Sequence, residues 1–213
     1  MIYLLIKYIL IIYFYWVLDI SVHGLDNVPK KSPAIIVANH PGLLDGLLIM
    51  TVMKRRFHTF AKEKVFNSRF KMLFLRSVGG IPVGSEETNN NAFIEAQKLL
   101  KKNKLLLIFP EGKINADPDL LPFKSGFLKL AVECNVPVVP VLIMGSEKSL
   151  KSGQFFPRPS NIYVRFLEPQ SFNISNEYPD RLLDKKELQY YIEEVKNKIQ
   201  HKLNFLRETH AAS

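Results

Sequence analysis

Residues 34–46 read Ala-Ile-Ile-Val-Ala-Asn-His-Pro-Gly-Leu-Leu-Asp-Gly, an apolar run that passes through a turn into the start of a helix. The apolar residues 34–38 predict a short buried strand. Pro41 and Gly42 end this strand and predict a turn. Asp45 then falls in the first turn of the predicted helix. The stretch is therefore typical of a strand–turn–helix unit with polar side chains gathered at the turn.

His40 lies at the end of this strand, five positions before Asp45. The two side chains can meet across the turn, where the carboxylate accepts a hydrogen bond from one imidazole nitrogen and fixes the tautomer. The other nitrogen is then free to take a proton, which makes His40 a candidate general base oriented by Asp45. With five His and 20 acidic residues in the chain, this spacing also arises by chance. The alternative is a solvated turn histidine beside a helix N-cap aspartate.

Apolar runs alternate with helical patterns along the rest of the chain. The predicted strands are 34–38, 57–61, 78–83, 104–109, 136–144 and 161–167. The predicted helices are 45–55, 64–76, a helix capped by Thr88 that runs to 102, and 125–134. Nearly all-apolar strands that alternate with helices predict an α/β fold, a central and largely parallel sheet with helices on both faces. In such sheets the functional site lies beyond the carboxyl ends of the strands, where His40 is expected.

Glu111 is predicted to lie at a second strand end, because four apolar residues run into Phe109-Pro110-Glu111-Gly112. Residues 121–126 then open a helix, whose free main-chain N–H groups favour anions, and Lys124 would add positive charge. The alternatives are an ordinary loop carboxylate for Glu111 and a solvated charge for Lys124.

The net charge of +9 on a chain of 213 residues indicates an anionic partner, which is nucleic acid, an anionic membrane surface or an anionic substrate. The length and the 47% of hydrophobic residues indicate one folded domain with a sizeable core. No element typical of nucleic-acid recognition is found, so no nucleic-acid partner is expected. Cys134 is the only cysteine, which excludes an intramolecular disulfide and a cysteine-cluster metal site.

Residues 1–18 are apolar apart from the single charge of Lys7. They predict a membrane helix, either spanning the bilayer or lying in its interface, with Trp16 among the aromatic residues near one end. The alternative is a buried core helix. Lys30, Lys31 and the basic domain behind them favour the cytoplasmic face of the membrane for the rest of the chain.

The tail from Asp184 predicts a long helix, because Asp184 and Glu187 have capping-box spacing. One apolar stripe follows at Leu188, Ile192, Val195, Ile199, Leu203 and Leu206. This helix is expected to pack on the body, with a membrane-surface helix as the alternative. The predicted organisation is a membrane-anchoring helix at 1–22, a catalytic domain at 23–183 and a C-terminal amphipathic helix at 184–213.

Four blocks, in this order, resemble the glycerolipid acyltransferases of the lysophosphatidic acid acyltransferase (1-acylglycerol-3-phosphate acyltransferase) type. They are Asn39-His40-Pro41-Gly42-Leu43-Leu44-Asp45, which matches the family's His-x-x-x-x-Asp block; Ala61-Lys62-Glu63 with Gly79-Gly80-Ile81-Pro82-Val83; Phe109-Pro110-Glu111-Gly112 with Leu121-Pro122-Phe123-Lys124-Ser125-Gly126; and Val136-Pro137-Val138-Val139-Pro140-Val141. The similarity covers roughly residues 22–170, and the ordered set is more specific than any block alone.

This resemblance implies an O-acyltransferase of phospholipid biosynthesis at the membrane. Such an enzyme moves a fatty acyl group from acyl-CoA or acyl-carrier protein, as co-substrate, to a lysolipid hydroxyl. His40 and Asp45 would be the catalytic pair. The resemblance also implies substrate-binding positions at Asn39, Phe109, Pro110, Glu111, Gly112, Lys113 and Lys124. No bound cofactor and no metal are expected, because a thioester is already activated. A non-catalytic lipid-binding relative remains the alternative.

The chain departs from the family pattern at two positions that usually hold arginine. Gly84 and Ser85 follow the second block where the family usually has Asp-Arg, and Lys113 and Ile114 follow Glu111-Gly112 where it has Thr-Arg. The family associates both arginines with the acceptor phosphate. An acceptor other than lysophosphatidate is therefore a second expectation, although Lys113 would supply a point charge without the bidentate fork of arginine.

Overall fold

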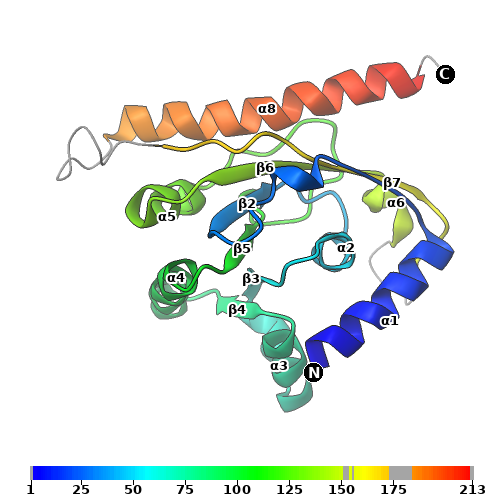
Figure 1. Cartoon of the computed structure of the whole chain (residues 1–213), viewed down its shortest axis with the longest axis horizontal. Helices are drawn as coiled ribbons and strands as arrows, with labels where there is room; N and C mark the ends of the chain where they lie inside the picture. The colour runs from blue at the N-terminus through cyan, green and yellow to red at the C-terminus, as the bar shows by residue number, and fades with distance from the viewer. Residues whose placement is uncertain (1, 151–153, 155, 173–183, 212–213) are drawn as a thin grey trace.

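A seven-stranded sheet forms the centre of the protein in the computed structural model, which describes residues 2–150, 154, 156–172 and 184–211 (Figure 1). The strands are β1 Asp19–His23, β2 Ala34–Ala38, β3 Phe57–Lys62, β4 Gly80–Val83, β5 Leu105–Ile108, β6 Val138–Met144 and β7 Asn161–Phe166. Their order across the sheet is β1-β7-β6-β2-β5-β3-β4. All neighbouring strands are parallel except β6 and β7, which are antiparallel. The predicted α/β fold with a largely parallel sheet is confirmed.

Helices cover both faces of this sheet. They are α1 Ile2–Val17, α2 Asp45–Val52, α3 Arg69–Ser77, α4 Glu86–Lys101, α5 Gly126–Cys134, α6 Ser146–Ser149 and α8 Lys185–Ala211, with the short 3-10 helices η1 Leu25–Asn27 and η2 Glu63–Phe66. The core on one face is closed by α4, α5 and α8, and the core on the other by α1 and α2 (Figure 1).

Strand β2 lies near the middle of the sheet, between β6 and β5, and is fully buried. Its side chains alternate between the two cores, so Ile35 and Val37 join the α4–α5–α8 side whereas Ile36 joins the α1–α2 side. A strand that is apolar on both faces fits only such a central position. The carboxyl end of β2 therefore brings His40 to the middle of one sheet edge.

The structure differs from the sequence prediction at the start of α4 and at β1. The N-cap of α4 is Ser85 and not Thr88, because Ser85 and Thr88 form a reciprocal capping box in which Thr88 is the third helical residue. Strand β1 was not predicted, since Asp19, Ser21 and His23 interrupt its apolar pattern at the edge of the sheet. The sheet therefore begins before residue 23, where the catalytic domain was predicted to start.

Helix α1 has 16 residues, and one side of it packs against the body. Phe14 is 2% exposed in the core beneath α1 and α2, and the ammonium group of Lys7 donates to the main-chain carbonyl of Met53. Among the described residues, no helix is both long and apolar enough to cross a membrane. At about 1.5 Å per residue, α1 falls short of the ~30 Å hydrocarbon layer. The predicted spanning helix is therefore not supported.

Helix α8 lies along the sheet over β6, as Figure 1 shows. Residues of its apolar stripe are buried in the core shared with α4 and α5: Ile192, Val195, Ile199, Leu203 and Leu206. Gln200 further ties the helix to the body, because its side chain accepts from the main-chain N–H of Leu120 and donates to the carbonyl of Pro118.

Candidate active site

His40 and Asp45 meet across the turn that follows β2. The Nδ1 atom of His40 lies 2.7 Å from Oδ2 of Asp45, and the same oxygen accepts the main-chain N–H of Gly42 at 2.9 Å. Asp45 is fully buried, whereas 20% of the His40 side chain is exposed. Among the described residues, nothing hydrogen-bonds Nε2 of His40. The arrangement can therefore hold one imidazole nitrogen on a carboxylate and leave the other for proton transfer.

The second oxygen of Asp45 is also engaged. Oγ of Ser146 lies 2.5 Å from Oδ1 of Asp45, and Ser146 is fully buried at the start of α6. The sequence did not point to Ser146, because this contact joins segments 101 positions apart and Ser146 lies outside the quoted blocks. Only the crossing of β6 beside β2 brings the two residues together.

The Asn39 side chain, at the end of β2, is buried and bonded to β6 rather than exposed to solvent. Its side-chain amide donates to the carbonyl of Ile143 at 2.8 Å and accepts the N–H of Ile143 at 2.7 Å. The residue is 3% exposed. Because these main-chain contacts use both ends of the amide, Asn39 fixes the position of β2 against β6 next to His40. A direct contact between Asn39 and substrate stays a prediction.

Glu111 lies beyond the carboxyl end of β5 and reaches the main chain of His40. One carboxylate oxygen accepts the N–H of His40 at 3.0 Å, and the other accepts from Asn115 Nδ2 at 3.1 Å and the N–H of Leu121 at 3.0 Å. Glu111 is only 5% exposed. The carboxylate thus joins the His40 turn to the loop before α5. Its contact with substrate stays a prediction, and its hydrogen bonds in the structure are with protein donors.

The ring of Phe109 lies between His40 and a cavity at the carboxyl edge of the sheet. The ring stacks on the His40 imidazole with centroids 4.2 Å apart and planes inclined by 20°. The cavity, of about 830 Å³, is also lined by Pro110 and Gly112. Apolar side chains make much of its wall: Phe60, Val83, Ala92, Phe93, Ile108 and Phe127. The space is suited to a ligand with a substantial apolar part.

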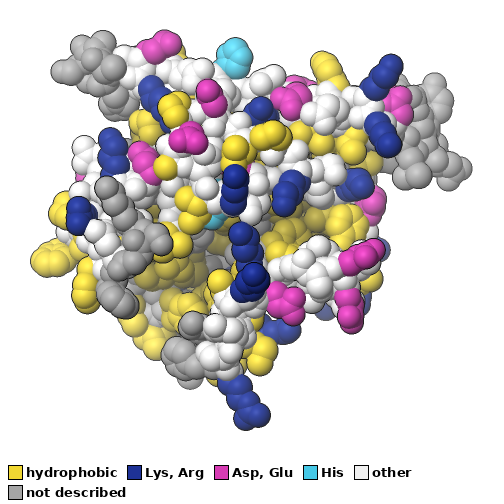
Figure 2. Space-filling model, turned by 180° about the vertical axis from the view of Figure 1, so that it is seen from behind, with side chains coloured by type: hydrophobic (Ala, Val, Ile, Leu, Met, Phe, Trp, Pro, Cys, Tyr) yellow, Lys and Arg dark blue, Asp and Glu magenta, His cyan; other side chains and the backbone are white. Residues whose placement is uncertain are grey.

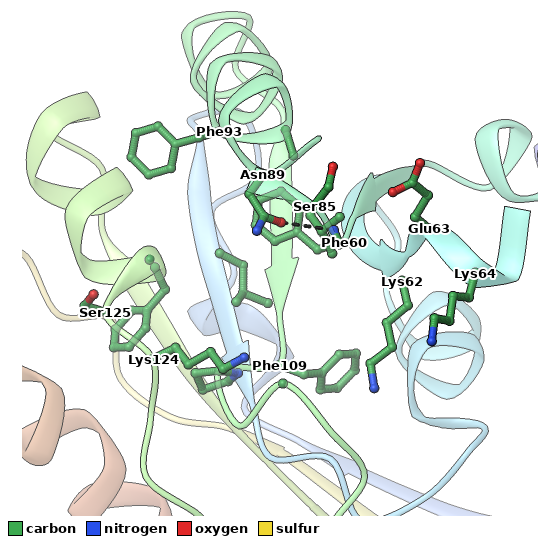
Figure 3. Close-up of a pocket in the computed structure, with 18 residues that line it drawn as sticks. Phe60, Lys62, Glu63, Lys64, Ser85, Asn89, Phe93, Phe109, Lys124 and Ser125 are labelled. Atoms are coloured by element: carbon green, nitrogen blue, oxygen red, sulfur yellow. Dashed lines mark hydrogen bonds between the residues drawn. The ribbon is translucent and has the colours of Figure 1, made fainter. Parts of the chain in front are cut away.

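Three lysines stand around this cavity, namely Lys62, Lys64 and Lys124 (Figure 3). Lys124 was predicted, and it passes so close to Gly112 that a Cβ there would lie 2.7 Å from its Nζ. Gly112 also has a φ of 71°, which favours glycine. Lys113 does not line the cavity. Lys62 lies in the second quoted block, yet neither it nor Lys64 was singled out, since a charge at a strand end is usually solvated.

These features together define a candidate base-catalysed site at the carboxyl edge of an α/β sheet. The comparisons with known proteins agree on what kind of protein carries it. The family model described as Acyltransferase matches residues 19–144. The chain is 30% identical over 165 residues to a 1-acyl-sn-glycerol-3-phosphate acyltransferase of Limnanthes alba, covering 75% of this chain and 57% of the relative. It is 31% identical over 157 residues to the alpha form from Mus musculus, covering 71% and 55%.

A solved structure shares the architecture as well. The crystal structure of the 1-acyl-sn-glycerophosphate (LPA) acyltransferase PlsC from Thermotoga maritima superposes with a TM-score of 0.74 and 28% identity. This match covers 95% of the present chain and 78% of that one. The chain belongs to the acyltransferase family. It spans little more than half the length of the curated relatives just described.

Proposed function

We propose that this protein transfers a fatty acyl group from an acyl thioester, acyl-CoA or acyl-carrier protein, to the hydroxyl of a lysophospholipid. The observation that carries the proposal is the contact of 2.7 Å between His40 Nδ1 and the buried Asp45, beside a largely apolar cavity. Family membership and the relatives' names support the same reaction.

The proposed reaction begins when Nε2 of His40 takes the proton of the acceptor hydroxyl. The freed oxygen attacks the thioester carbonyl carbon and forms a tetrahedral intermediate. The carbon–sulfur bond then breaks, and the leaving thiolate takes the proton from the imidazolium. Asp45 keeps the tautomer and stabilises the imidazolium without itself moving a proton. A positioned base of this kind contributes about 10²–10⁴ in rate.

The cavity offers separate surroundings for the two parts of a lipid substrate. Its phenylalanine-rich wall suits an acyl chain, and the lysines around it suit phosphate groups on the acceptor or on the acyl donor. No catalytic step in this scheme requires a metal or a bound cofactor.

The acceptor is proposed to be a lysolipid other than lysophosphatidate. Its recognition by the protein would depend less on a bare phosphate group. Ser85 lines the cavity, but its hydroxyl is committed to the capping box of α4. Ile114 is 44% exposed and does not line the cavity. Neither position supplies the planar guanidinium that grips phosphate through two parallel bonds. The second candidate is thus an acyltransferase for a zwitterionic lysolipid.

The protein is proposed to work at a membrane surface, held by the outward face of α1. This face is apolar, with exposed side chains at Leu4, Leu5, Tyr8, Ile9, Ile12, Tyr15 and Trp16. The only charged group of α1, on Lys7, instead faces the body and reaches Met53. In Figure 2, hydrophobic side chains gather on the side of the molecule where Figure 1 places α1. Such a helix fits the bilayer interface, and Lys30 and Lys31 favour its cytoplasmic side.

A panel of lysolipids in vesicles, offered with acyl-CoA and with acyl-carrier protein, tests the proposal. Thiol release and mass spectrometry of the lipid product are measured together. His40→Ala is expected to lower turnover at least about a hundredfold while the fold is kept, because the base is lost. Asp45→Asn is expected to impair turnover strongly as well. A well-folded wild type that binds lipid without releasing thiol would identify a non-catalytic relative instead.

A further inference from the structure

The buried hydroxyl of Ser146 has no function in the scheme above, although it contacts the acidic member of the pair. Its Oγ lies 2.5 Å from Oδ1 of Asp45, and both residues are fully buried. An ionised carboxylate only accepts hydrogen bonds, so the hydroxyl is the donor. The distance lies in the range of about 2.5–2.7 Å that is typical of O–H···O⁻ bonds. Ser146 therefore donates a short, charge-assisted bond to Asp45.

This bond completes the fixation of the Asp45 carboxylate. Oδ2 faces His40 Nδ1 and the N–H of Gly42, while Oδ1 faces Ser146. The terminal torsion of an aspartate is broad, so bonds to one oxygen alone leave the carboxylate plane poorly defined. Donors on both oxygens hold the plane. Without Ser146, Oδ1 would be a buried acceptor lacking this donor, and the carboxylate would turn to find another.

The close approach of α6 to the turn after β2 depends on the glycine at position 42. A Cβ at Gly42 would lie 2.6 Å from both the carbonyl oxygen and Oγ of Ser146. The turn after β2 can thus meet the start of α6 only because residue 42 has no side chain. Gly42 therefore has two functions, since its N–H bonds Asp45 and its missing side chain admits Ser146.

We propose that Ser146 is a positioning residue for the proposed acyl transfer. It holds Asp45 so that His40 keeps Nδ1 bonded and presents Nε2 to the acceptor hydroxyl. This inference rests on the proposed function. It has a specific consequence, because a residue that acts only through Asp45 and His40 loses its influence on turnover once His40 is removed.

Ser146→Ala is expected to lower kcat roughly tenfold, a part of the about 10²–10⁴ that a positioned base supplies, with KM for both substrates unchanged within about twofold. The double variant His40→Ala/Ser146→Ala is expected to match His40→Ala. Ser149→Ala is the matched control, since Ser149 is an equally buried serine of α6 that bonds the Ser146 carbonyl and not Asp45. Its kcat is expected to stay near that of wild type.

The proposal is overturned if Ser146→Ala keeps normal kcat, or if the double variant falls a further tenfold below His40→Ala. If the alanine variant does not fold, kcat is measured for Ser146→Cys instead. A thiol is only a weak donor, so kcat is again expected to fall.

A measurement without turnover separates this inference from the proposed function. The downfield proton resonance of His40 Nδ1–H is assigned by its loss in His40→Ala. It is expected to broaden or move in Ser146→Ala and to stay unchanged in Ser149→Ala. An unaltered resonance in Ser146→Ala overturns the positioning role whether or not the wild type transfers acyl groups. Absence of acyl transfer in the wild type would overturn the proposed function alone.

Discussion

At the scale of single residues, Glu111 shows how the main chain of the candidate base is held. Its Oε1 accepts the N–H of His40, and the N–H of Asn115 donates to the carbonyl of His40. Both polar groups of the His40 peptide backbone are therefore bonded to the segment that follows β5. The imidazole is positioned from two directions, by Asp45 at the ring and by Glu111 at the backbone.

Glu111→Gln is expected to lower turnover about tenfold and to reduce the thermal midpoint. Glutamine keeps the size of the side chain, but its amide nitrogen cannot accept the N–H groups that both carboxylate oxygens now accept. Leaving a buried donor unpaired costs about 1–3 kcal/mol. Steady-state kinetics and thermal unfolding measure the two effects. Asn115→Ala is the control, since it removes a donor to Oε2 and leaves the Oε1 contact with His40; equal turnover losses in both variants would contradict the argument.

Ser85→Arg is expected to shift relative kcat/KM toward lysophosphatidate and away from lysophosphatidylethanolamine. A guanidinium at the cavity would bind a phosphate monoester through charge-assisted bonds, which contribute about 1.5–3 kcal/mol each. The change also removes the α4 cap, at a cost of about 1 kcal/mol in stability. Ser85→Ala removes the cap without adding charge and is the control. Equal shifts in the two variants would show that the cap, not the charge, changes acceptor preference.

The sequence allowed the His40–Asp45 pair to be predicted because both residues lie in one turn. Asn39 and Glu111 were also singled out, yet their structural contacts depend on which strands lie beside β2. Ser146 was not singled out because its partner Asp45 lies 101 positions away, and Lys62 was not singled out because the cavity that it lines is formed by several separate segments. Local spacing is visible in a sequence, whereas the register of neighbouring strands is set by the packing of the whole sheet.

At the scale of elements, α1 differs from an ordinary surface helix because it is apolar on both sides and turns its one charged residue, Lys7, toward the body. A surface helix normally turns charged residues outward. In α1, Lys7 is half-buried against α2, and burial lowers the pKa of its ammonium group. Ile12 and Trp16 are 72% and 84% exposed. An exposed apolar face of this kind is typical of an interaction surface, and a lipid surface is the occupant proposed above.

Ile12→Lys is expected to weaken vesicle binding severalfold without changing the thermal midpoint. The new charge would enter the interface in place of an exposed isoleucine, and the packed side of α1 is untouched. Ile94→Lys is the matched control, because Ile94 is a 47% exposed isoleucine on α4. Vesicle sedimentation measures the bound fraction. Equal weakening in both variants would mean that α1 has no particular contact with lipid.

The free energy of unfolding is expected to decrease as the pH is lowered, because of His58 in β3. Burial lowers its pKa below the ordinary value of 6.5, and the nearby Arg56 and Lys104 lower it further. Below about pH 6.5 the unfolded chain takes up a proton that the folded protein resists, so the free energy of unfolding decreases until the lowered pKa is reached. His58→Gln is expected to lose less stability between about pH 7.5 and pH 5.5 in urea titrations. Parallel curves for the two proteins would contradict this.

Most strands and helices were predicted within a few residues of their observed bounds, and the exceptions are edge and surface segments. Strand β2 occupies the predicted 34–38 because it is buried on both faces. The predicted helix at 64–76 divides into η2 and α3, and β1 was missed, since edge and surface segments have mixed patterns that local rules do not resolve. The apolar pattern of residues 1–18 predicted a helix, but only tertiary packing reveals which of its sides contacts the body.

At the scale of the whole molecule, the proposed binding to a membrane surface would combine two independent attractions in one chain. The net charge of +9 would draw the protein to anionic surfaces, and this attraction acts over a Debye length of about 10 Å at 0.1 M salt. The apolar face of α1 acts only on contact, through burial of surface from water, which salt does not screen. The two contributions therefore separate experimentally by ionic strength and by lipid charge.

Wild-type protein is expected to bind anionic vesicles most strongly at low salt and to lose only part of this binding near 1 M salt, where the Debye length is about 3 Å. Binding to zwitterionic vesicles is expected to be weaker and nearly independent of salt, because only α1 contributes there. Ile12→Lys should lower this salt-independent part severalfold, so that binding of the variant to anionic vesicles depends more strongly on salt than binding of the wild type. Vesicle sedimentation across a salt series measures the bound fraction of the wild type on both kinds of vesicle and of the variant.

Because α1 also buries Phe14 in the core, a point substitution is a sharper probe than deletion of the helix. Complete release of the wild type from anionic vesicles by salt alone would show that charge is the anchor, and the outward face of α1 would then need another partner.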